Sequence, residues 1–171
     1  MLILPDFLDG PAVAELLAAN ARYAGDRRGK GTPWTDCPLA AIAPHLVADL
    51  AERAANALHD GCPHLPGLDP DYVAYTVMLA GASHTLHADA VKDAAGTPNH
   101  TPHRVATAML YLGGPADFAG GQILFPGLGV AVEPRPGTLV AFLCDWRHRH
   151  QVERVTRGER HALALWFKEA R

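Results

Sequence analysis

The sequence predicts a mostly β fold (α+β), in which a double-stranded β-helix (jelly-roll) core is buttressed by two or three N-terminal helices. Three observations predict it. The 16 Gly and 14 Pro residues fall mostly between apolar runs, as in proteins with many short strands. Apolar residues recur at helical spacing only in the N-terminal part, and β-rich runs follow from residue 72 onward. The 171 residues are expected to form one domain, with helical support over about 1–70 and the jelly roll over about 71–171.

The chain is expected to open with a short strand over residues 2–4 and a first helix. Asp9 is a candidate N-cap, and Pro11 suits the first turn of a helix over roughly 11–22. The inward face of this helix is predicted to carry Leu16, Leu17 and Ala21.

A loop and a second helix are expected next. Residues 25–38 are rich in Gly and turn formers and are predicted to be a loop, with a solvated basic patch of Arg22, Arg27, Arg28 and Lys30. From about 44 to 59, apolar residues recur at helical spacing opposite a polar face. Residues 60–70, with several prolines and glycines, are interpreted as a connector that fixes where the strands begin.

The C-terminal part contains β-rich runs separated by Gly and Pro, as in a double-sheet jelly roll. Strands are predicted over residues 72–79, 104–112, 121–125, 130–133, 138–143, 150–155 and 161–167. The longest interruption, residues 90–103, is placed to act as a lid over the site described next.

The composition indicates which partners and which cellular compartment are expected. The formal charge of −3 and a pI near 6.3 argue against a protein that binds nucleic acid by neutralising phosphates. Three cysteines without a C-x-x-C pair indicate neither a disulfide framework nor a zinc ribbon. The first apolar run is too short for a signal peptide, and no stretch is long enough to span a membrane. We expect a cytoplasmic monomer or homodimer that acts on a small molecule or peptide, without nucleic-acid or membrane partners.

His87-Ala88-Asp89 is a candidate metal site, because a strand sends residues i and i+2 to the same face. His148 and His150 share one strand face, and either could supply a third ligand; downstream spacing favours His150. Two histidines and a carboxylate on one face of an octahedron leave positions open for cosubstrate and dioxygen, as in non-haem Fe(II) oxygenases.

Arg160 is a candidate for binding an anion beside that metal site. Residues 157–160 are predicted to form a tight turn between two strands, from which Arg160 would point back into the barrel. A buried arginine requires an anion, and the strand that carries Tyr111 could bring a hydroxyl to the same carboxylate.

The order and spacing of several motifs give a family resemblance from about Thr76 to Glu169. They are L-H-A-D at 86–89, R-V-A-T-A-M-L-Y-L at 104–112, G-G-Q-I-L-F-P at 120–126, P-R-P-G-T-L-V-A-F at 134–142, H-Q-V-x-x-V at 150–155 and G-E-R-H-A-L-A-L-W-F at 158–167. This stretch resembles the prolyl-4-hydroxylase-like family of Fe(II)- and 2-oxoglutarate-dependent dioxygenases.

The resemblance implies that His87, Asp89 and His150 bind the catalytic Fe(II). It also implies that Arg160 pairs with the distal carboxylate of 2-oxoglutarate, with help from the Tyr111 hydroxyl. The implied reaction hydroxylates an unactivated C–H bond, with release of succinate and CO2 and with ascorbate as an optional reductant. The substrate expected from this resemblance is a prolyl or other amino-acid residue, or a free amino acid.

Two further positions are assigned by the same resemblance. Trp166 would line the cosubstrate pocket, and Arg104, near the pocket mouth, would contact substrate. The chain departs from the family where relatives carry a tyrosine, because Met78 and Leu79 stand there.

Two other functions are compatible with such a barrel. A nucleic-acid demethylase would use the same iron chemistry, but the net acidity of the chain does not favour a phosphate-binding surface. A non-catalytic, cupin-like module would bind a metal or ligand without producing succinate. The presence of Asp89 favours hydroxylation over halogenation, since halogenating relatives lack the carboxylate.

Overall fold

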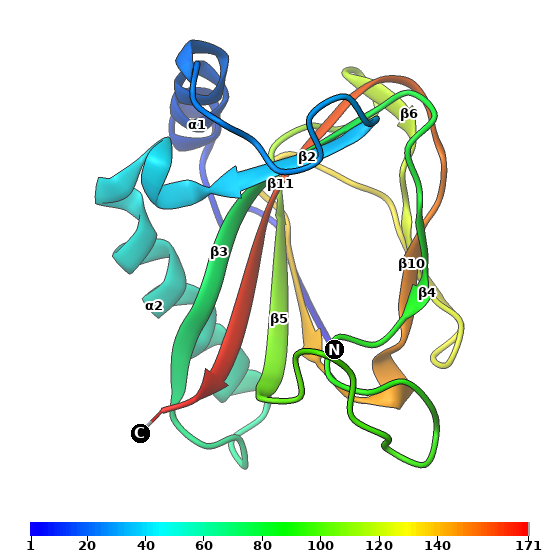
Figure 1. Cartoon of the computed structure of the whole chain (residues 1–171). Helices are drawn as coiled ribbons and strands as arrows, with labels where there is room; N and C mark the ends of the chain where they lie inside the picture. Colours follow the sequence, from blue (N-terminus) through cyan, green and yellow to red (C-terminus); the bar gives the residue numbers. More distant parts are fainter. Residues whose placement is uncertain (171) are drawn as a thin grey trace.

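The computed structural model describes residues 1–170, and within them two antiparallel sheets face each other across a central space while helices cover the outside of one sheet (Figure 1). The helical elements are α1 (Gly10–Arg22), η1 (Leu39–Ala41), α2 (Pro44–Gly61) and η2 (Trp146–His148). The strands are β1 (Leu2–Leu4), β2 (Trp34–Pro38), β3 (Leu68–Leu79), β4 (His84–His87), β5 (Arg104–Tyr111), β6 (Phe118–Gly120), β7 (Ile123–Phe125), β8 (Val130–Val132), β9 (Leu139–Leu143), β10 (His150–Val152) and β11 (Val155–Glu169).

The larger, 7-stranded sheet has the order β1-β9-β5-β11-β3-β2, with β6 pairing β11 beyond this path, and the 4-stranded sheet has the order β4-β10-β7-β8. Non-consecutive neighbours in both sheets mean that the chain crosses repeatedly between them, as in a jelly roll. The predicted mostly β architecture, with helices against one sheet, is confirmed. Among residues 1–170, no helix is both long and apolar enough to cross a membrane.

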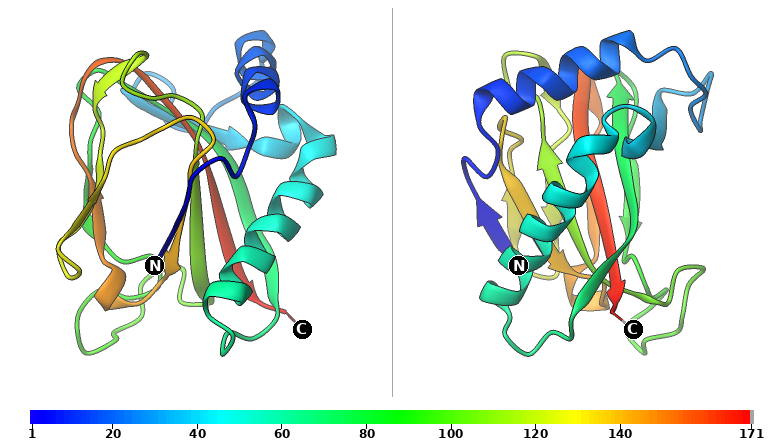
Figure 2. Two further views of the ribbon diagram at one scale, coloured as in Figure 1. Left: turned by 180° about the vertical axis from the view of Figure 1, so that it is seen from behind. Right: turned by 90° about the vertical axis from the view of Figure 1, so that its left-hand side faces the viewer.

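Both helices lie on the outer face of the larger sheet (Figure 2). Asp9 caps α1 as predicted, since its side chain accepts a hydrogen bond of 2.9 Å from the backbone N–H of Ala12. Leu16 is buried, but Ala21 is exposed, so the inward face of this helix is narrower than predicted. In α2 the buried residues Leu50, Ala51, Ala54 and Leu58 complete the layer against the sheet.

Strand β11 divides its side chains between two environments. Leu163, Leu165 and Phe167 belong to the core beneath the helices. The alternate residues face the space between the sheets: Arg160, Ala162, Ala164 and Trp166. The two small alanines leave room in that space, and the neighbouring strands β3 and β5 alternate in the same way.

One prediction about the N-terminal part is wrong, and one predicted strand in the middle of the chain begins later than expected. Residues 25–38 are not all loop, because Trp34–Pro38 forms β2 and pairs with β3, with Trp34 opposite Met78. The strand predicted over residues 121–125 is present as β7 but begins only at Ile123, because Gly120 and Gly121 adopt positive φ values of 75° and 69°.

The tight turn predicted at 157–160 is also wrong. The chain continues through these residues as the first part of β11, which pairs there with β6. Gly158 has a φ of 74°, and a Cβ built on it would lie 2.2 Å from the carbonyl oxygen of Asp117. This glycine therefore permits a close strand contact rather than a reversal of the chain.

Candidate active site

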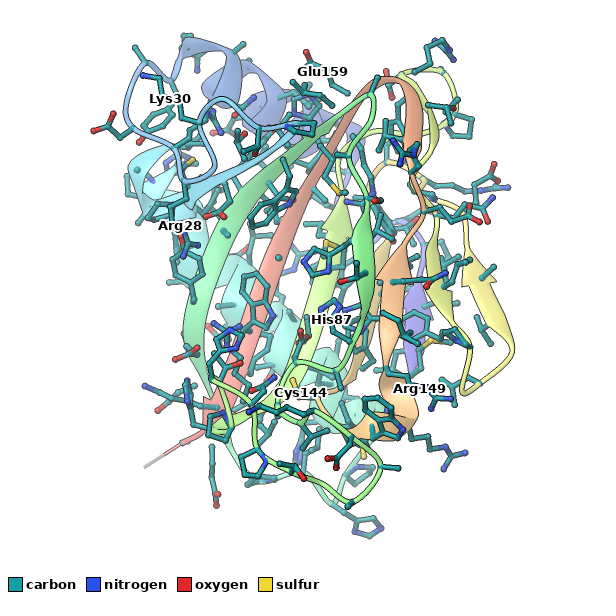
Figure 3. The ribbon with its side chains drawn as sticks, turned by 45° about the vertical axis from the view of Figure 1, so that its right-hand side comes forward. Arg28, Lys30, His87, Cys144, Arg149 and Glu159 are labelled. Carbon is teal, nitrogen blue, oxygen red and sulfur yellow. The ribbon has the colours of Figure 1, made fainter. Side chains whose placement is uncertain are left out.

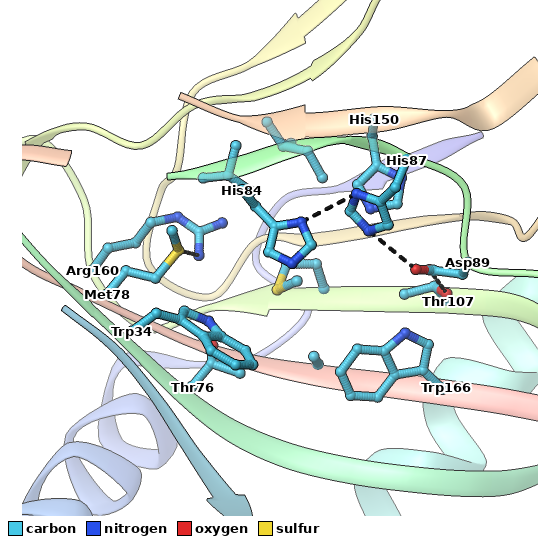
Figure 4. A pocket seen from close by; sticks show the side chains of 14 residues that line it. Trp34, Thr76, Met78, His84, His87, Asp89, Thr107, His150, Arg160 and Trp166 are labelled. Carbon is cyan, nitrogen blue, oxygen red and sulfur yellow. Dashed lines mark hydrogen bonds and ion pairs between the residues drawn. The ribbon is translucent and has the colours of Figure 1, made fainter. Parts of the chain in front are cut away.

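His87, Asp89 and His150 form a compact cluster between the sheets, with one ligand atom from each lying within 4.8 Å of the others. His87 and His150 are direct partners across β4 and β10, and their ring centroids are 4.4 Å apart. The Asp89 Oδ1 lies 3.4 Å from the His87 Nε2 (Figure 4). Figure 3 shows His87 directed into the space between the two sheets.

Backbone carbonyls fix the tautomers of both cluster histidines. The Nδ1 of His87 lies 2.8 Å from the carbonyl oxygen of Thr85, and the Nδ1 of His150 lies 3.1 Å from that of His148. A carbonyl only accepts, so each Nδ1 carries a proton, and Nε2 is the nitrogen of each ring that is left to bind a metal once it is unprotonated. Burial is the main cause that lowers the pKa of His150 to about 4, which favours the neutral form that a metal requires.

Asp89 is kept ionised although it is only 8% exposed. Burial alone would raise its pKa, but a hydrogen bond with His87, the charge of His150 and a hydrogen bond from Thr107 together lower it to about 2. The Thr107 hydroxyl donates to Oδ2, which leaves Oδ1 facing the histidines. The Cys144 Sγ lies 3.2 Å from the Thr107 oxygen, and burial followed by the charge of Asp89 raises the pKa of this thiol to about 12. The thiol therefore stays protonated and can donate to Thr107.

Replacing Thr107 by Val is expected to weaken metal binding by roughly 10- to 100-fold, because Asp89 loses the donor that orients its carboxylate. Anaerobic calorimetry with Mn(II) measures the change. Thr107→Ser keeps the hydroxyl and should restore most of the affinity. Equal affinity in the Val variant and the unaltered protein would show that the contact does not orient Asp89.

Arg160 is a buried cation without an anionic partner. It is 1% exposed, its Nε donates to the carbonyl oxygen of Gly121 at 3.0 Å, and its Nη1 lies 3.6 Å from the Sδ of Met78. Its Nη2 and the buried Tyr111 hydroxyl have no hydrogen-bond partner, and the guanidinium carbon lies 5.0 Å from the centroid of the Tyr111 ring. No carboxylate within residues 1–170 pairs with it. Because an unpaired buried charge is costly, this end of the cavity is suited to receive an anion.

Gly121 gives Arg160 the space that it occupies. Its φ is +69°, and an added Cβ would lie 2.9 Å from the Arg160 Cδ, whereas Gly129 has a φ of +67° with nothing within 4 Å of an added Cβ. Gly129→Ala is expected to cost about 1 kcal/mol from backbone strain. Gly121→Ala should cost about 1–3 kcal/mol more through overpacking, measured by urea unfolding. Equal losses in the two variants would contradict the proposed crowding.

The cavity connects Arg160 with the metal cluster and opens into a wider groove of about 430 Å³. One wall of the groove is a stack of flat groups. The guanidinium carbon of Arg28 lies 4.8 Å from the Tyr72 ring centroid, Tyr72 stacks on Trp166 at 5.9 Å and 16°, and Arg104 lies 4.6 Å over Trp166. The wall therefore offers extended planar surface beside the metal cluster.

The two arginines of this wall are each held by an aspartate. The Arg28 Nε donates to the Asp36 Oδ1 at 2.7 Å, and the Arg104 Nε donates to the Asp71 Oδ2 at 2.9 Å. The indole N–H of Trp166 is buried and has no partner, so the wall also contains one free donor. With both guanidiniums neutralised, the wall is not a general anion-binding surface.

A family model described as the 2OG-Fe(II) oxygenase superfamily matches residues 72–168, which is more than half of the chain and includes every residue of the cluster. This chain belongs to the 2OG-Fe(II) oxygenase superfamily. The chain is also 39% identical to mouse (Mus musculus) prolyl 3-hydroxylase 1 over 137 residues, a match that covers 77% of this chain but only 16% of that protein. The chain thus spans about a sixth of the length of this relative.

Solved structures of other oxygenases share the fold. The 2OG complex of the viral collagen prolyl hydroxylase vCPH from Paramecium Bursaria Chlorella virus-1 aligns with a TM-score of 0.75 at 20% identity, covering 99% of this chain and 96% of that one. A Pseudomonas putida prolyl-4-hydroxylase aligns with a TM-score of 0.68 at 25% identity, covering 99% and 92%. The jelly-roll fold predicted from the sequence is that of these oxygenases.

The cavity of this 2OG-Fe(II) oxygenase superfamily member fits Fe(II) and 2-oxoglutarate, the two groups in the family's description. Two imidazoles and one carboxylate are a donor set that can hold Fe(II) with open positions. At the other end, the unpartnered Nη2 of Arg160 and the Tyr111 hydroxyl are suited to a carboxylate such as the distal one of 2-oxoglutarate.

The structure also shows where the remaining predicted residues lie. His148 is turned away from the cluster, with its Nδ1 2.7 Å from the Asp145 Oδ1, so only His150 of the two candidates joins it. Trp166 lines both the cavity and the groove, and Arg104 lies in the groove. Met78, one of the two residues predicted to depart from the family pattern, contacts Arg160 through its thioether.

The C-terminal part of the 90–103 loop is hydrogen-bonded to the backbone of Asp89. The Asn99 side chain donates to the Asp89 carbonyl oxygen at 2.9 Å, and the Thr101 hydroxyl donates to the same oxygen at 2.6 Å. Asn99, His100 and Thr101 line the groove, so the loop forms part of its wall. Whether it also closes as a lid remains a prediction.

Sequence reasoning missed several residues of the site: Arg28, Trp34, Tyr72, His84 and Thr107. A signal existed for Thr107, because the two-residue period of its strand places it on the same face as Tyr111. Arg28 had been predicted to be solvated; its side chain is 64% exposed but also pairs with the buried Asp36.

Proposed function

We propose that this chain is an Fe(II)- and 2-oxoglutarate-dependent dioxygenase that hydroxylates an unactivated C–H bond of a prolyl or other amino-acid residue, in a peptide or as the free amino acid. One observation carries the proposal. A buried guanidinium without an anion, beside a tyrosine hydroxyl without a partner, shares one cavity with a cluster of two histidines and an aspartate. Such a cavity is suited to a ligand with a carboxylate at one end and metal-binding oxygens at the other.

His87, Asp89 and His150 are proposed to hold Fe(II). When bound together with 2-oxoglutarate and dioxygen, Fe(II) supplies the oxidation of the C–H bond, with release of succinate and CO2. Asp89 supplies the negative charge of the ligand set, while the carbonyls behind both histidines keep each Nε2 available. This arrangement would hold Fe(II) by three protein ligands and leave coordination positions open for cosubstrate and dioxygen.

Arg160 and Tyr111 are proposed to bind the distal carboxylate of 2-oxoglutarate. Both groups are fully enclosed by the sheets, so their contacts form in a low-dielectric setting where a charge-assisted hydrogen bond is strong. The Gly121 carbonyl and the Tyr111 ring keep the guanidinium in place before the cosubstrate arrives. The cosubstrate is therefore positioned without reorganisation of these side chains.

The groove is proposed to bind the substrate, with Arg104 and Trp166 at its wall. The flat faces of Tyr72 and Trp166 suit a saturated ring or a planar amide, and the free indole N–H suits a carbonyl oxygen. The names of the matched relatives, which are prolyl hydroxylases, support a prolyl substrate. Ascorbate is proposed as a reductant that restores Fe(II), and a reducing cytoplasm suits the free thiols of Cys37, Cys62 and Cys144.

The experiment that tests this function measures succinate from protein reconstituted anaerobically with Fe(II) and then given 2-oxoglutarate and air. It is run with and without proline peptides and free amino acids, and repeated without ascorbate. Succinate formation stimulated by one compound, together with a mass increase of one oxygen atom in that compound, is expected. Bound iron without succinate under every condition would instead support a non-catalytic, ligand-binding barrel.

A further inference from the structure

His84, at the start of β4, lines the same cavity as Arg160 and the metal cluster but has no role in the function proposed above. Figure 4 shows its ring between the Arg160 guanidinium and His87. Its ring centroid lies 4.3 Å from that of His87 and 6.2 Å from that of Trp34, which meets it edge-on. The imidazole is thus held between two neighbours on the path from one end of the cavity to the other.

The contact with His87 determines which nitrogen of His84 carries the proton. The Nδ1 atoms of the two rings are 3.1 Å apart, and the His87 Nδ1 also lies 2.8 Å from the Thr85 carbonyl oxygen. Because that carbonyl only accepts, the proton resides on the His87 Nδ1, and the His84 Nδ1 must face it with a lone pair. A ring with an unprotonated Nδ1 carries its N–H on Nε2. His84 is therefore a neutral imidazole with one donor, Nε2–H.

This donor has no acceptor among residues 1–170, and its side of the ring faces the cavity (Figure 4). Neighbouring hydroxyls are already engaged: Thr76 donates to the Ala162 carbonyl at 3.0 Å, and Thr107 donates to Asp89. Met78 contributes a thioether and no hydroxyl. His84 is therefore a side chain placed to donate to a ligand between Arg160 and the metal cluster, and its ring lies between these two ends.

We propose that His84 is a positioning residue for the cosubstrate, which donates from Nε2 to the 2-oxoglutarate carboxylate at the metal end of the cavity. The inference rests on the proposed function, since it requires a dicarboxylate whose other end meets Arg160. A donor at this point fixes how that carboxylate is turned at the metal.

Three variants test which of the two ring nitrogens of His84 is needed for binding. His84→Gln places an amide nitrogen near the position of Nε2, His84→Asn places one only near the position of Nδ1, and His84→Phe keeps an aromatic ring without a polar atom. His64→Gln, at an exposed histidine of the connector, is the matched control. Circular dichroism confirms that each variant folds before its binding is measured.

Binding is measured anaerobically in two steps, without turnover. Calorimetry gives the Kd for Mn(II), and the visible charge-transfer absorption of the Fe(II) protein gives the Kd for 2-oxoglutarate. His84→Asn and His84→Phe are expected to weaken 2-oxoglutarate binding by roughly tenfold or more, as for loss of a hydrogen bond to a charged group. His84→Gln and His64→Gln should stay within about threefold of the unaltered protein, and all four should bind Mn(II) normally.

Each other result overturns the inference in a distinguishable way. Unchanged 2-oxoglutarate affinity in His84→Phe, with a higher KM for the hydroxylated substrate, would assign His84 to the groove. Loss of Mn(II) affinity parallel to that of 2-oxoglutarate would mean that His84 acts through His87. An unaltered protein that binds Mn(II) but no 2-oxoglutarate would overturn the proposed function itself.

Discussion

Asp89→Asn is expected to abolish hydroxylation and to weaken Fe(II) or Mn(II) binding by at least about 100-fold, more than loss of an outer contact such as Thr107. Asparagine has nearly the shape of aspartate and can still accept the Thr107 hydrogen bond, so the change isolates the charge. Without it, a divalent cation meets two neutral imidazoles and an amide. Asp89→Ala should lose turnover as well, and it also leaves Thr107 without its acceptor.

Anaerobic calorimetry with Mn(II) and the succinate assay together measure this effect. Asp60→Ala, at an exposed aspartate near the end of α2, is the control and should match the unaltered protein in both. The metal-free Asp89→Asn protein should remain folded, because its side chain keeps a hydrogen-bond partner. Normal turnover in either Asp89 variant, without added carboxylate, would overturn the assignment of His87, Asp89 and His150 as the metal site.

Arg160→Met is expected to raise the 2-oxoglutarate concentration needed for turnover by about 100-fold or more, while metal affinity stays within about twofold. The distal carboxylate loses a buried charge-assisted contact, which is worth more than an exposed one. The fold should suffer less than the roughly 3–5 kcal/mol typical of a broken buried ion pair, since no carboxylate is left behind. The remaining structural cost is the loss of the hydrogen bond to the Gly121 carbonyl.

Titration of the anaerobic Fe(II) protein with 2-oxoglutarate, and urea unfolding of the metal-free protein, measure the two effects separately. Arg157→Met is the control, because Arg157 lies on the same strand but is exposed. Equal 2-oxoglutarate affinity in Arg160→Met and Arg157→Met would contradict the carboxylate assignment. A loss of metal affinity in Arg160→Met would mean that the guanidinium supports the cluster rather than the cosubstrate.

The elements that the sequence predicted well are those with a clear local period. Alternating side chains point to opposite faces of the sheet in residues 104–112 and 161–167. The first predicted strand ends one residue beyond β5, and the second lies inside β11. By contrast, Trp34–Pro38 becomes a strand because it pairs with β3, a partner far along the chain. The glycine at 158 has the same positive φ that a tight turn would use, and its role depends on the approach of Asp117.

In the candidate site too, features with a local sequence pattern could be predicted, and features that depend on contacts between distant segments could not. The His-x-Asp spacing and the position of Arg160 can be read from the sequence alone, so the cluster and the buried Arg160 beside it could be predicted. The stack of Arg28, Tyr72, Trp166 and Arg104 could not, because its members come from separate segments and meet only when β3, β5 and β11 lie side by side. The hydrogen bond from Thr107 to Asp89 likewise depends on how β5 faces the end of β4.

Arg160 and Trp166 belong to one uninterrupted strand, which is expected to limit the length of the diacid that the proposed enzyme accepts. Six residues of extended chain separate their Cα atoms by roughly 20 Å along a strand that pairs with β3 throughout and with β5 from Ala162 onward. Because the backbone of Arg160 is paired with Met78 and its Nε donates to the Gly121 carbonyl, the guanidinium is not expected to move toward the metal for a shorter diacid or away from it for a longer one. Oxaloacetate, one carbon shorter, and 2-oxoadipate, one carbon longer, should be poor replacements for 2-oxoglutarate even at high concentration.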